Sequence, residues 1–124
     1  PFFWKANGRV YLFFSASGTG SEYCVGCLYA GENADLMNPS SWTKLDHPIL
    51  STGHVPAEYG PGHNCVVEDE EGTLLFVYHA RPAEHEKGTC GYSQCHPLYD
   101  PCRHARIRKL TWTEEGIPEI CTAE

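Results

Sequence analysis

An internal repeat limits what this chain can fold into more than any other feature of its sequence. Residues 3–17 read FWKANGRVYLFFSAS and residues 67–81 read VEDEEGTLLFVYHAR, so each copy is an apolar segment, a turn and a second apolar segment. Gly8 and Gly72 mark the two turns, and the Asn-Gly pair at the first is typical of a tight hairpin, because both central residues of such a turn need a positive φ. The repeat therefore predicts two β-hairpins.

Further strands are expected after each hairpin. Apolar runs at residues 23–30 and 104–112 follow the two copies, and shorter segments at residues 42–45 and 117–120 could each add a fourth strand. The second long run alternates, with Ala105 and Ile107 on one face and Arg106 and Arg108 on the other. The prediction is an all-β chain with about two four-stranded antiparallel units, as in the blades of a β-propeller. A single β-sandwich is the alternative.

The predicted units divide the chain at a stretch rich in Pro, Gly and His. Residues 1–45 form the first blade-like unit, residues 46–63 the connection, and residues 64–124 the second unit. The stretch from His47 to Gly62 is too irregular in sequence to predict a strand. The chain opens on Pro1 and a strand-like segment, so we expect it to be a piece of something longer, and its localisation cannot be predicted.

Charge and hydropathy narrow the possible partners. Nine Lys and Arg stand against sixteen Asp and Glu, giving a formal net charge of −7. Nucleic acids and anionic membranes are polyanions, so neither is an expected partner. No apolar run approaches the roughly 20 residues needed to span a bilayer. A neutral carbohydrate is compatible with this composition.

The seven cysteines are an odd number, so at least one cannot pair within the chain. Cys24 and Cys27 form a C-x-x-C, but residues three apart on a strand point to opposite faces. We expect both to be free thiols that pack as small apolar groups.

The segment 84–102 offers soft metal ligands. Zinc could bind in this loop, although the spacing matches no standard zinc pair, and one disulfide or reduced thiols are the alternatives. A small Cys/His zinc module is therefore one alternative hypothesis for this chain. The candidate ligands are Cys90, Cys95 and Cys102, with His85, His96 and His104.

His63 is the best single candidate for a functional residue. It follows Gly60-Pro61-Gly62, which brings the backbone close to a neighbour, and it precedes an apolar strand. In a propeller, this places His63 at the start of the innermost strand of a blade, facing the central channel. The alternative is a structural histidine satisfied by hydrogen bonds.

Several motifs resemble glycoside hydrolase family 43. Gly60-Pro61-Gly62-His63-Asn64, the strand end at residues 77–81 (VYHAR) and residues 96–107 (HPLYDPCRHARI) are similar to the last blade of that family. Residues 15–17 (SAS) and 23–26 (YCVG) are similar to the blade before it. The match covers nearly the whole chain in the right order.

The resemblance implies a five-bladed β-propeller that cleaves arabinose- or xylose-containing polysaccharides or oligosaccharides with inversion, as an α-L-arabinofuranosidase or β-xylosidase. Such an enzyme uses one carboxylic acid and one carboxylate base, with a third carboxylate that orients the acid. Pro1 matches the Pro of the family's Glu-Gly-Pro motif, so the general acid is expected two residues upstream of Pro1. No catalytic carboxylate is expected within the chain, which should be inactive alone.

The resemblance assigns roles to two residues of this chain. His63 matches a family histidine beneath the active site that helps hold a central calcium ion, often through water, and Arg103 matches an arginine that reaches the sugar pocket. Both are predicted to be substrate-binding. Calcium is expected only in the complete propeller, and the chain by itself should need no cofactor.

Other acidic residues are not assigned catalysis. Residues 68–71 are expected to form a solvated hairpin tip, and nothing pairs Glu58 with a second carboxylate. A non-catalytic carbohydrate-binding or structural β-module is the main alternative to an enzyme. In either case, exposed strand edges and apolar faces should make the isolated chain self-associate.

Overall fold

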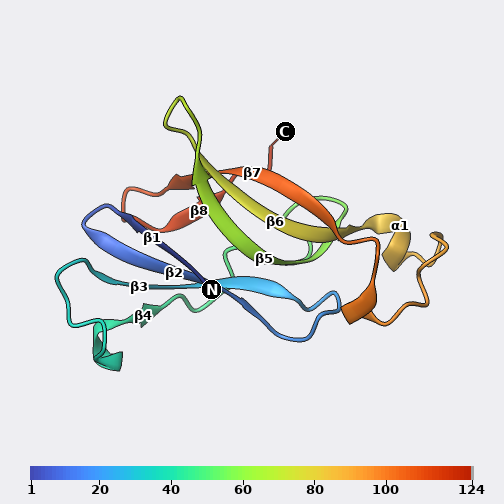
Figure 1. Cartoon of the computed structure of the whole chain (residues 1–124), viewed down its shortest axis with the longest axis horizontal. Coiled ribbons are helices and arrows are strands. Elements are labelled where there is room, and N and C mark those ends of the chain that lie inside the picture. Colours follow the sequence, from blue (N-terminus) through green and yellow to red (C-terminus); the bar gives the residue numbers. More distant parts are fainter. Residues whose placement is uncertain (124) are drawn as a thin grey trace.

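A computed structural model describes residues 1–123 as two four-stranded antiparallel sheets. Each sheet is a simple meander, with strand orders β1-β2-β3-β4 and β5-β6-β7-β8. Figure 1 shows the second sheet, green to red, lying over the first, blue to teal. The prediction of an all-β chain with two four-stranded antiparallel blades is confirmed. No helix among residues 1–123 is long and apolar enough to cross a membrane.

The first sheet is built on the predicted Asn-Gly hairpin. The strands β1 (Phe2–Ala6) and β2 (Arg9–Ala16) are joined by Asn7 and Gly8, whose φ angles are 54° and 67°. This is the conformation that a tight two-residue turn requires. The sheet continues with β3 (Cys24–Gly31), and after a 3-10 helix, η1 (Pro39–Ser41), it ends with the short strand β4 (Thr43–Lys44).

The second sheet begins earlier than the sequence indicates. Strand β5 runs over Glu58–Glu68, so part of the stretch that we expected to be irregular is paired with β6 (Leu74–Pro82). Two register shifts interrupt this pairing, between Tyr59 and Gly62 and between Gly62 and Cys65. These irregularities let a segment rich in Gly and Pro remain in the sheet, because a bulge accommodates residues that a regular ladder excludes.

The remaining elements complete the second sheet. A single helical turn, α1 (Ala83–Glu86), and a 3-10 helix, η2 (Pro97–Tyr99), occupy the long loop after β6. Strands β7 (His104–Trp112) and β8 (Pro118–Ile120) follow. In Figure 1, α1 and this loop lie at the right-hand end of the molecule.

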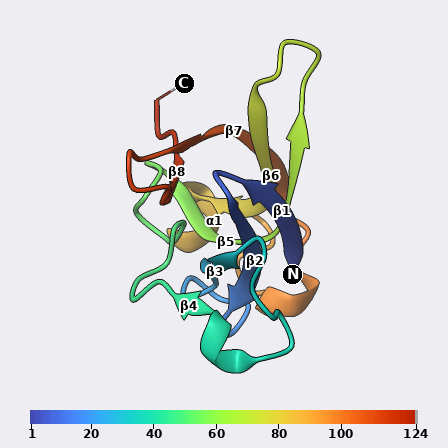
Figure 2. The same cartoon turned by 90° about the vertical axis from the view of Figure 1, so that its left-hand side faces the viewer.

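The hydrophobic core lies between the two sheets. Strand β5 packs against β2 and β3 where the sheets meet, as the end view in Figure 2 also shows. The Phe13 and Phe76 rings make an edge-to-face contact with centroids 5.5 Å apart. Tyr11 is fully buried, and its hydroxyl donates a hydrogen bond to the Gly116 carbonyl at 2.7 Å. The two repeat copies thus share one core.

Candidate functional site

The site begins at the irregular part of β5, where the backbone approaches its neighbours too closely for any side chain. A Cβ at Gly62 would lie 2.0 Å from Cε1 of Tyr23, and one at Gly60 would lie 2.4 Å from the Gly20 carbonyl oxygen. Gly60 also has a φ of 55°. The close approach predicted for Gly-Pro-Gly is therefore present, and it places the loop before β3 directly against β5.

The backbone of His63 is fixed by a hydrogen bond, whereas its imidazole ring is exposed. Its φ is 54°, a conformation uncommon for residues other than glycine. The backbone N–H donates a hydrogen bond to Ser15 Oγ at 2.8 Å, which ties His63 to the end of β2. A pocket of about 350 Å³ opens here. Its lining residues are Pro1, Phe14, Ser15, Tyr23, His63 and Asn64.

Arg103 joins both halves of the molecule just before β7. Its Nη1 donates hydrogen bonds to the Gly60 carbonyl at 2.8 Å and to His79 Nδ1 at 3.2 Å, and its Nη2 donates to the Thr19 carbonyl. The guanidinium also lies 5.3 Å from the ring centroid of Tyr23, a cation–π contact. These bonds leave Nε–H and one Nη2 hydrogen for other acceptors.

His79 connects the two predicted residues, and sequence reasoning assigned it no role. Its ring centroid lies 5.8 Å from that of His63 and 6.2 Å from that of Tyr23, with which it is stacked. Burial, followed by the nearby charges of Arg103 and His63, lowers the pKa of His79 below its ordinary value. The one feature of the sequence that could have pointed to His79 is that it is a polar residue within an otherwise apolar strand segment, in the motif VYHAR. His63 and Arg103 thus belong to one cluster with Tyr23 and His79.

The described residues around His63 do not form a calcium site by themselves. Calcium prefers six to eight oxygen ligands, whereas His63 belongs to no group of three or more His, Cys, Asp or Glu side chains with converging ligand atoms in residues 1–123. The close neighbours of His63 are an imidazole, a hydroxyl and the Asn64 amide, whose buried Nδ2 has no hydrogen-bond partner. The calcium role of His63 stays a prediction.

Glu58 lies in the core rather than in the pocket of His63. It accepts hydrogen bonds from the Tyr78 hydroxyl at 2.5 Å and from Arg108 Nη2 at 3.0 Å. Burial and the neighbouring Glu58 carboxylate raise the pKa of Tyr78, which therefore donates its proton to this bond. Both Glu58 oxygens are engaged, so the network locks β5 to β6 and β7.

Only some of the candidate zinc ligands come together. His85, Cys90 and Cys102 place one ligand atom each within 4.8 Å of one another, whereas Cys95, His96 and His104 do not join this group. All seven cysteines are free thiols. Cys24 and Cys27 share no metal group, and burial raises the pKa of Cys27 to about 12.

Two consecutive four-stranded meanders that share a core are the arrangement expected for neighbouring blades of a β-propeller. Residues 1–118 match the family model of the glycosyl hydrolases family 43. The chain belongs to this family.

The chain is also similar in sequence to named arabinofuranosidases. The chain is 39% identical over 115 residues to an α-L-arabinofuranosidase B of Pyricularia oryzae, and 40% identical over 115 residues to an extracellular exo-α-(1→5)-L-arabinofuranosidase of Streptomyces avermitilis. Each alignment covers 92% of this chain and 22% of the relative. The chain therefore spans about a fifth of the length of these curated relatives.

The architecture also matches solved structures. An α-L-arabinofuranosidase from Lactobacillus brevis superimposes with a TM-score of 0.80 at 37% identity, over 96% of this chain and 35% of that one. A thermostable family-43 glycoside hydrolase superimposes with a TM-score of 0.70 at 27% identity, over 97% of this chain and 34% of that one.

Proposed function

We propose that this chain forms two blades and one wall of the sugar pocket of an α-L-arabinofuranosidase. The observation that carries the proposal is the convergence of Tyr23, His63, His79 and Arg103, which come from both halves of the chain. Four relatives at 39–43% identity are named as arabinofuranosidases. Structures named for xylan or xylosidase activity are 20–21% identical and support only the fold.

The proposed role of this chain is to bind and orient the sugar. Arg103 is fixed by three acceptors and keeps two N–H donors free, so its guanidinium is preorganised for hydroxyl oxygens or for a carboxylate. Tyr23 lines the pocket and lies against Arg103, which connects the guanidinium to the pocket wall. His63 would contact the sugar directly or a calcium ion through water.

The chemistry itself requires groups from other blades. An inverting glycosidase places its acid and base carboxyl groups about 6.5–9.5 Å apart to admit a water molecule. Glu58 is buried and held by Tyr78 and Arg108, so it is not available for this work. We therefore expect the isolated chain to be inactive and to acquire activity when the remaining blades complete the propeller.

A chimera tests this function. The segment of the Streptomyces avermitilis arabinofuranosidase that aligns with this chain is replaced by the chain, and hydrolysis of an aryl α-L-arabinofuranoside is compared with that of an aryl β-D-xyloside. We expect preference for the arabinofuranoside. An Arg103→Met variant should lower kcat/KM about 10- to 100-fold, as expected for the loss of a hydrogen bond to a charged group.

A matched control variant accompanies Arg103→Met. Arg9→Met removes an arginine far from the pocket, which bonds the Glu115 carbonyl at the other end of the sheets, and should leave kcat/KM within about twofold. A chimera that prefers the xyloside would contradict the arabinofuranosidase assignment. Hydrolysis by the 124-residue chain alone, lost on Glu58→Gln, would show that the chain carries its own catalytic carboxylates.

We also propose that the isolated chain self-associates through the outer faces of its sheets. Phe3, Leu12 and Leu28 share one outer face through their cross-strand pairing, and Val77 and Ile107 share the other. Phe3 is 51% exposed and Ile107 is 62% exposed. In a complete propeller, neighbouring blades would cover such faces, and in their absence a second copy can do so.

A further inference from the structure

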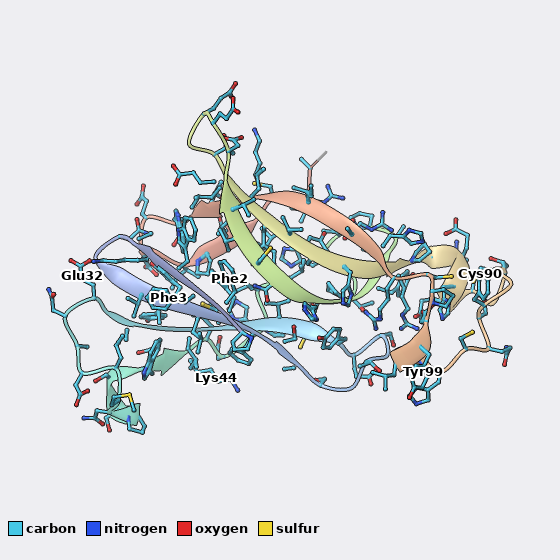
Figure 3. The ribbon with its side chains drawn as sticks, in the orientation of Figure 1. Phe2, Phe3, Glu32, Lys44, Cys90 and Tyr99 are labelled. Carbon is cyan, nitrogen blue, oxygen red and sulfur yellow. The ribbon has the colours of Figure 1, made fainter. Side chains whose placement is uncertain are left out.

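A second polar cluster lies at the end of β6, away from the pocket of His63. It is formed by His85 in α1, Cys90 in the following loop, and Cys102 and Asp100 just before β7. Figure 3 shows Cys90 at the right-hand end of the molecule beside α1, far from Phe3 and Glu32 at the other end. His85 and Asp100 are buried, and the two cysteines are half-buried.

Two of the three ligand separations in this cluster fit tetrahedral coordination of one metal ion. Cys90 Sγ lies 3.5 Å from Cys102 Sγ and 3.5 Å from His85 Nδ1. With Zn–S bonds of about 2.3 Å and Zn–N bonds of about 2.0–2.1 Å, tetrahedral angles place two sulfurs about 3.8 Å apart and a sulfur and a nitrogen about 3.5 Å apart. The two separations from Cys90 Sγ thus lie within about 0.3 Å of these coordinated values, and the third, between Cys102 Sγ and the His85 ring nitrogen, is within 4.8 Å.

Asp100 supplies an independent indication that His85 is a ligand. While His85 Nδ1 faces Cys90, His85 Nε2 lies 3.1 Å from Asp100 Oδ2. The Asp100 side chain is fully buried, and its Oδ2 has no well-aligned hydrogen-bond partner, although it lies 3.7 Å from Arg81 Nε. A metal-bound histidine typically donates its second ring N–H to such a carboxylate, which fixes the tautomer and the ring orientation. Coordination through Nδ1 would direct the Nε2 proton toward this oxygen.

The same geometry argues against a preformed disulfide. The sulfur atoms of Cys90 and Cys102 are 3.5 Å apart, whereas a disulfide bond is about 2.05 Å long. Two thiolates and one imidazole form a soft ligand set that favours zinc over calcium or magnesium.

We propose that His85 Nδ1, Cys90 Sγ and Cys102 Sγ bind one Zn²⁺, with water at the fourth position and Asp100 as the partner of His85. The ion would close the loop between α1 and β7. Because Cys102 directly precedes Arg103, it would also fix the backbone that presents the Arg103 guanidinium. The site is distinct from the His63 cluster and does not depend on the proposed glycosidase activity.

Metal titration of the 124-residue chain tests the site. The chain is reduced with a phosphine, freed of metal and titrated with Co²⁺, and the cobalt is then displaced by Zn²⁺. We expect one cobalt per chain, with a thiolate-to-cobalt charge-transfer band that zinc abolishes. Cys90→Ser, Cys102→Ser and His85→Ala should each abolish this band, and Asp100→Asn should weaken metal affinity about 10- to 100-fold.

Cys95→Ser is the matched control, since Cys95 lies in the same loop but outside the cluster, and it should leave stoichiometry and affinity unchanged. X-ray absorption of the zinc-loaded wild-type chain gives a readout that needs no variant. Two sulfur neighbours at about 2.3 Å, with lighter atoms at about 2.0–2.1 Å, are expected. A reduced chain that binds no cobalt, any other number of sulfurs, or dependence on Cys95 would overturn the proposal.

Discussion

Arg103 Nη1 donates a hydrogen bond to His79 Nδ1 at 3.2 Å, which joins the loop before β7 to the end of β6. Arginine has no acceptor, so His79 must accept through Nδ1 and carry its proton on Nε2. The bond is lost if His79 takes a second proton, and the positive guanidinium would then face a positive imidazole. The arrangement therefore favours neutral His79, and it makes the site sensitive to acid.

The first prediction concerns pH. The pKa of His79 is lowered in the folded chain by burial and by Arg103 and His63, so the unfolded chain binds more protons below the ordinary histidine pKa. The contribution of His79 to the free energy of unfolding should therefore fall as the pH is lowered through the ordinary histidine pKa of about 6.5, and level off below the folded pKa. Urea unfolding measures the slope, which should be smaller in His79→Gln.

A ring-proton titration provides the direct check. Arg103→Gln removes one of the charges that disfavour the imidazolium, so the pKa of His79 should rise in this variant. Titration of wild-type His79 above the ordinary histidine range would contradict the geometry.

The second prediction concerns the packing of β5 against the loop before β3. Gly62→Ala would place a methyl group 2.0 Å from Tyr23 Cε1, so the Tyr23 ring or the β5 backbone must move. Such overpacking should lower the free energy of unfolding by about 1–3 kcal/mol. Gly91→Ala is the control, since nothing lies within 4 Å of its added Cβ, and it should stay within about 0.5 kcal/mol of wild type. Equal stabilities of the two variants would contradict this packing.

The repeat and its turns were enough to predict most of the fold. The Asn7-Gly8 pair predicts a tight turn because few residues tolerate positive φ, and both φ angles are positive in the structure. The start of β5 could not be predicted, because Gly60 and Pro61 normally end strands. They are kept in the sheet by two bulges and by tertiary contacts with Gly20 and Tyr23. Such contacts join residues far apart in sequence.

The candidate site was predictable only in part, because it too depends on contacts between residues far apart in sequence. His63 and Arg103 could be named from motifs, but His79 gains its role only when β6 and the loop before β7 bring three polar side chains together.

Strand β7 shows a related limit of prediction from sequence. Its alternation was correct, but the face that carries Arg106 and Arg108 turns inward, while Ile107 is 62% exposed. Glu58 and Tyr78 make this possible by meeting Arg108 inside the molecule.

The third prediction concerns that buried network. Glu58→Ala leaves the Arg108 guanidinium and the Tyr78 hydroxyl without their common acceptor, and it should lower the free energy of unfolding by about 3–5 kcal/mol. The exposed pair of Lys5 and Glu32, at 3.2 Å, is the control, and Glu32→Ala should cost at most about 1 kcal/mol. Chemical denaturation compares the two. A small effect of Glu58→Ala would show that water replaces the carboxylate and that the network is open to solvent.

The fourth prediction concerns the outer sheet faces. If a second copy of the chain covers Ile107, Ile107→Lys removes apolar burial worth about 1.5–3 kcal/mol. The dissociation constant of the dimer should therefore rise about 10- to 100-fold. Sedimentation equilibrium over a range of concentrations measures the change. Glu119→Gln on the exposed side of β8 is the control and should leave association unchanged. A wild-type chain that is monomeric at every concentration, with a sharp and reversible unfolding transition, would show instead that two blades bury enough apolar surface to be stable alone.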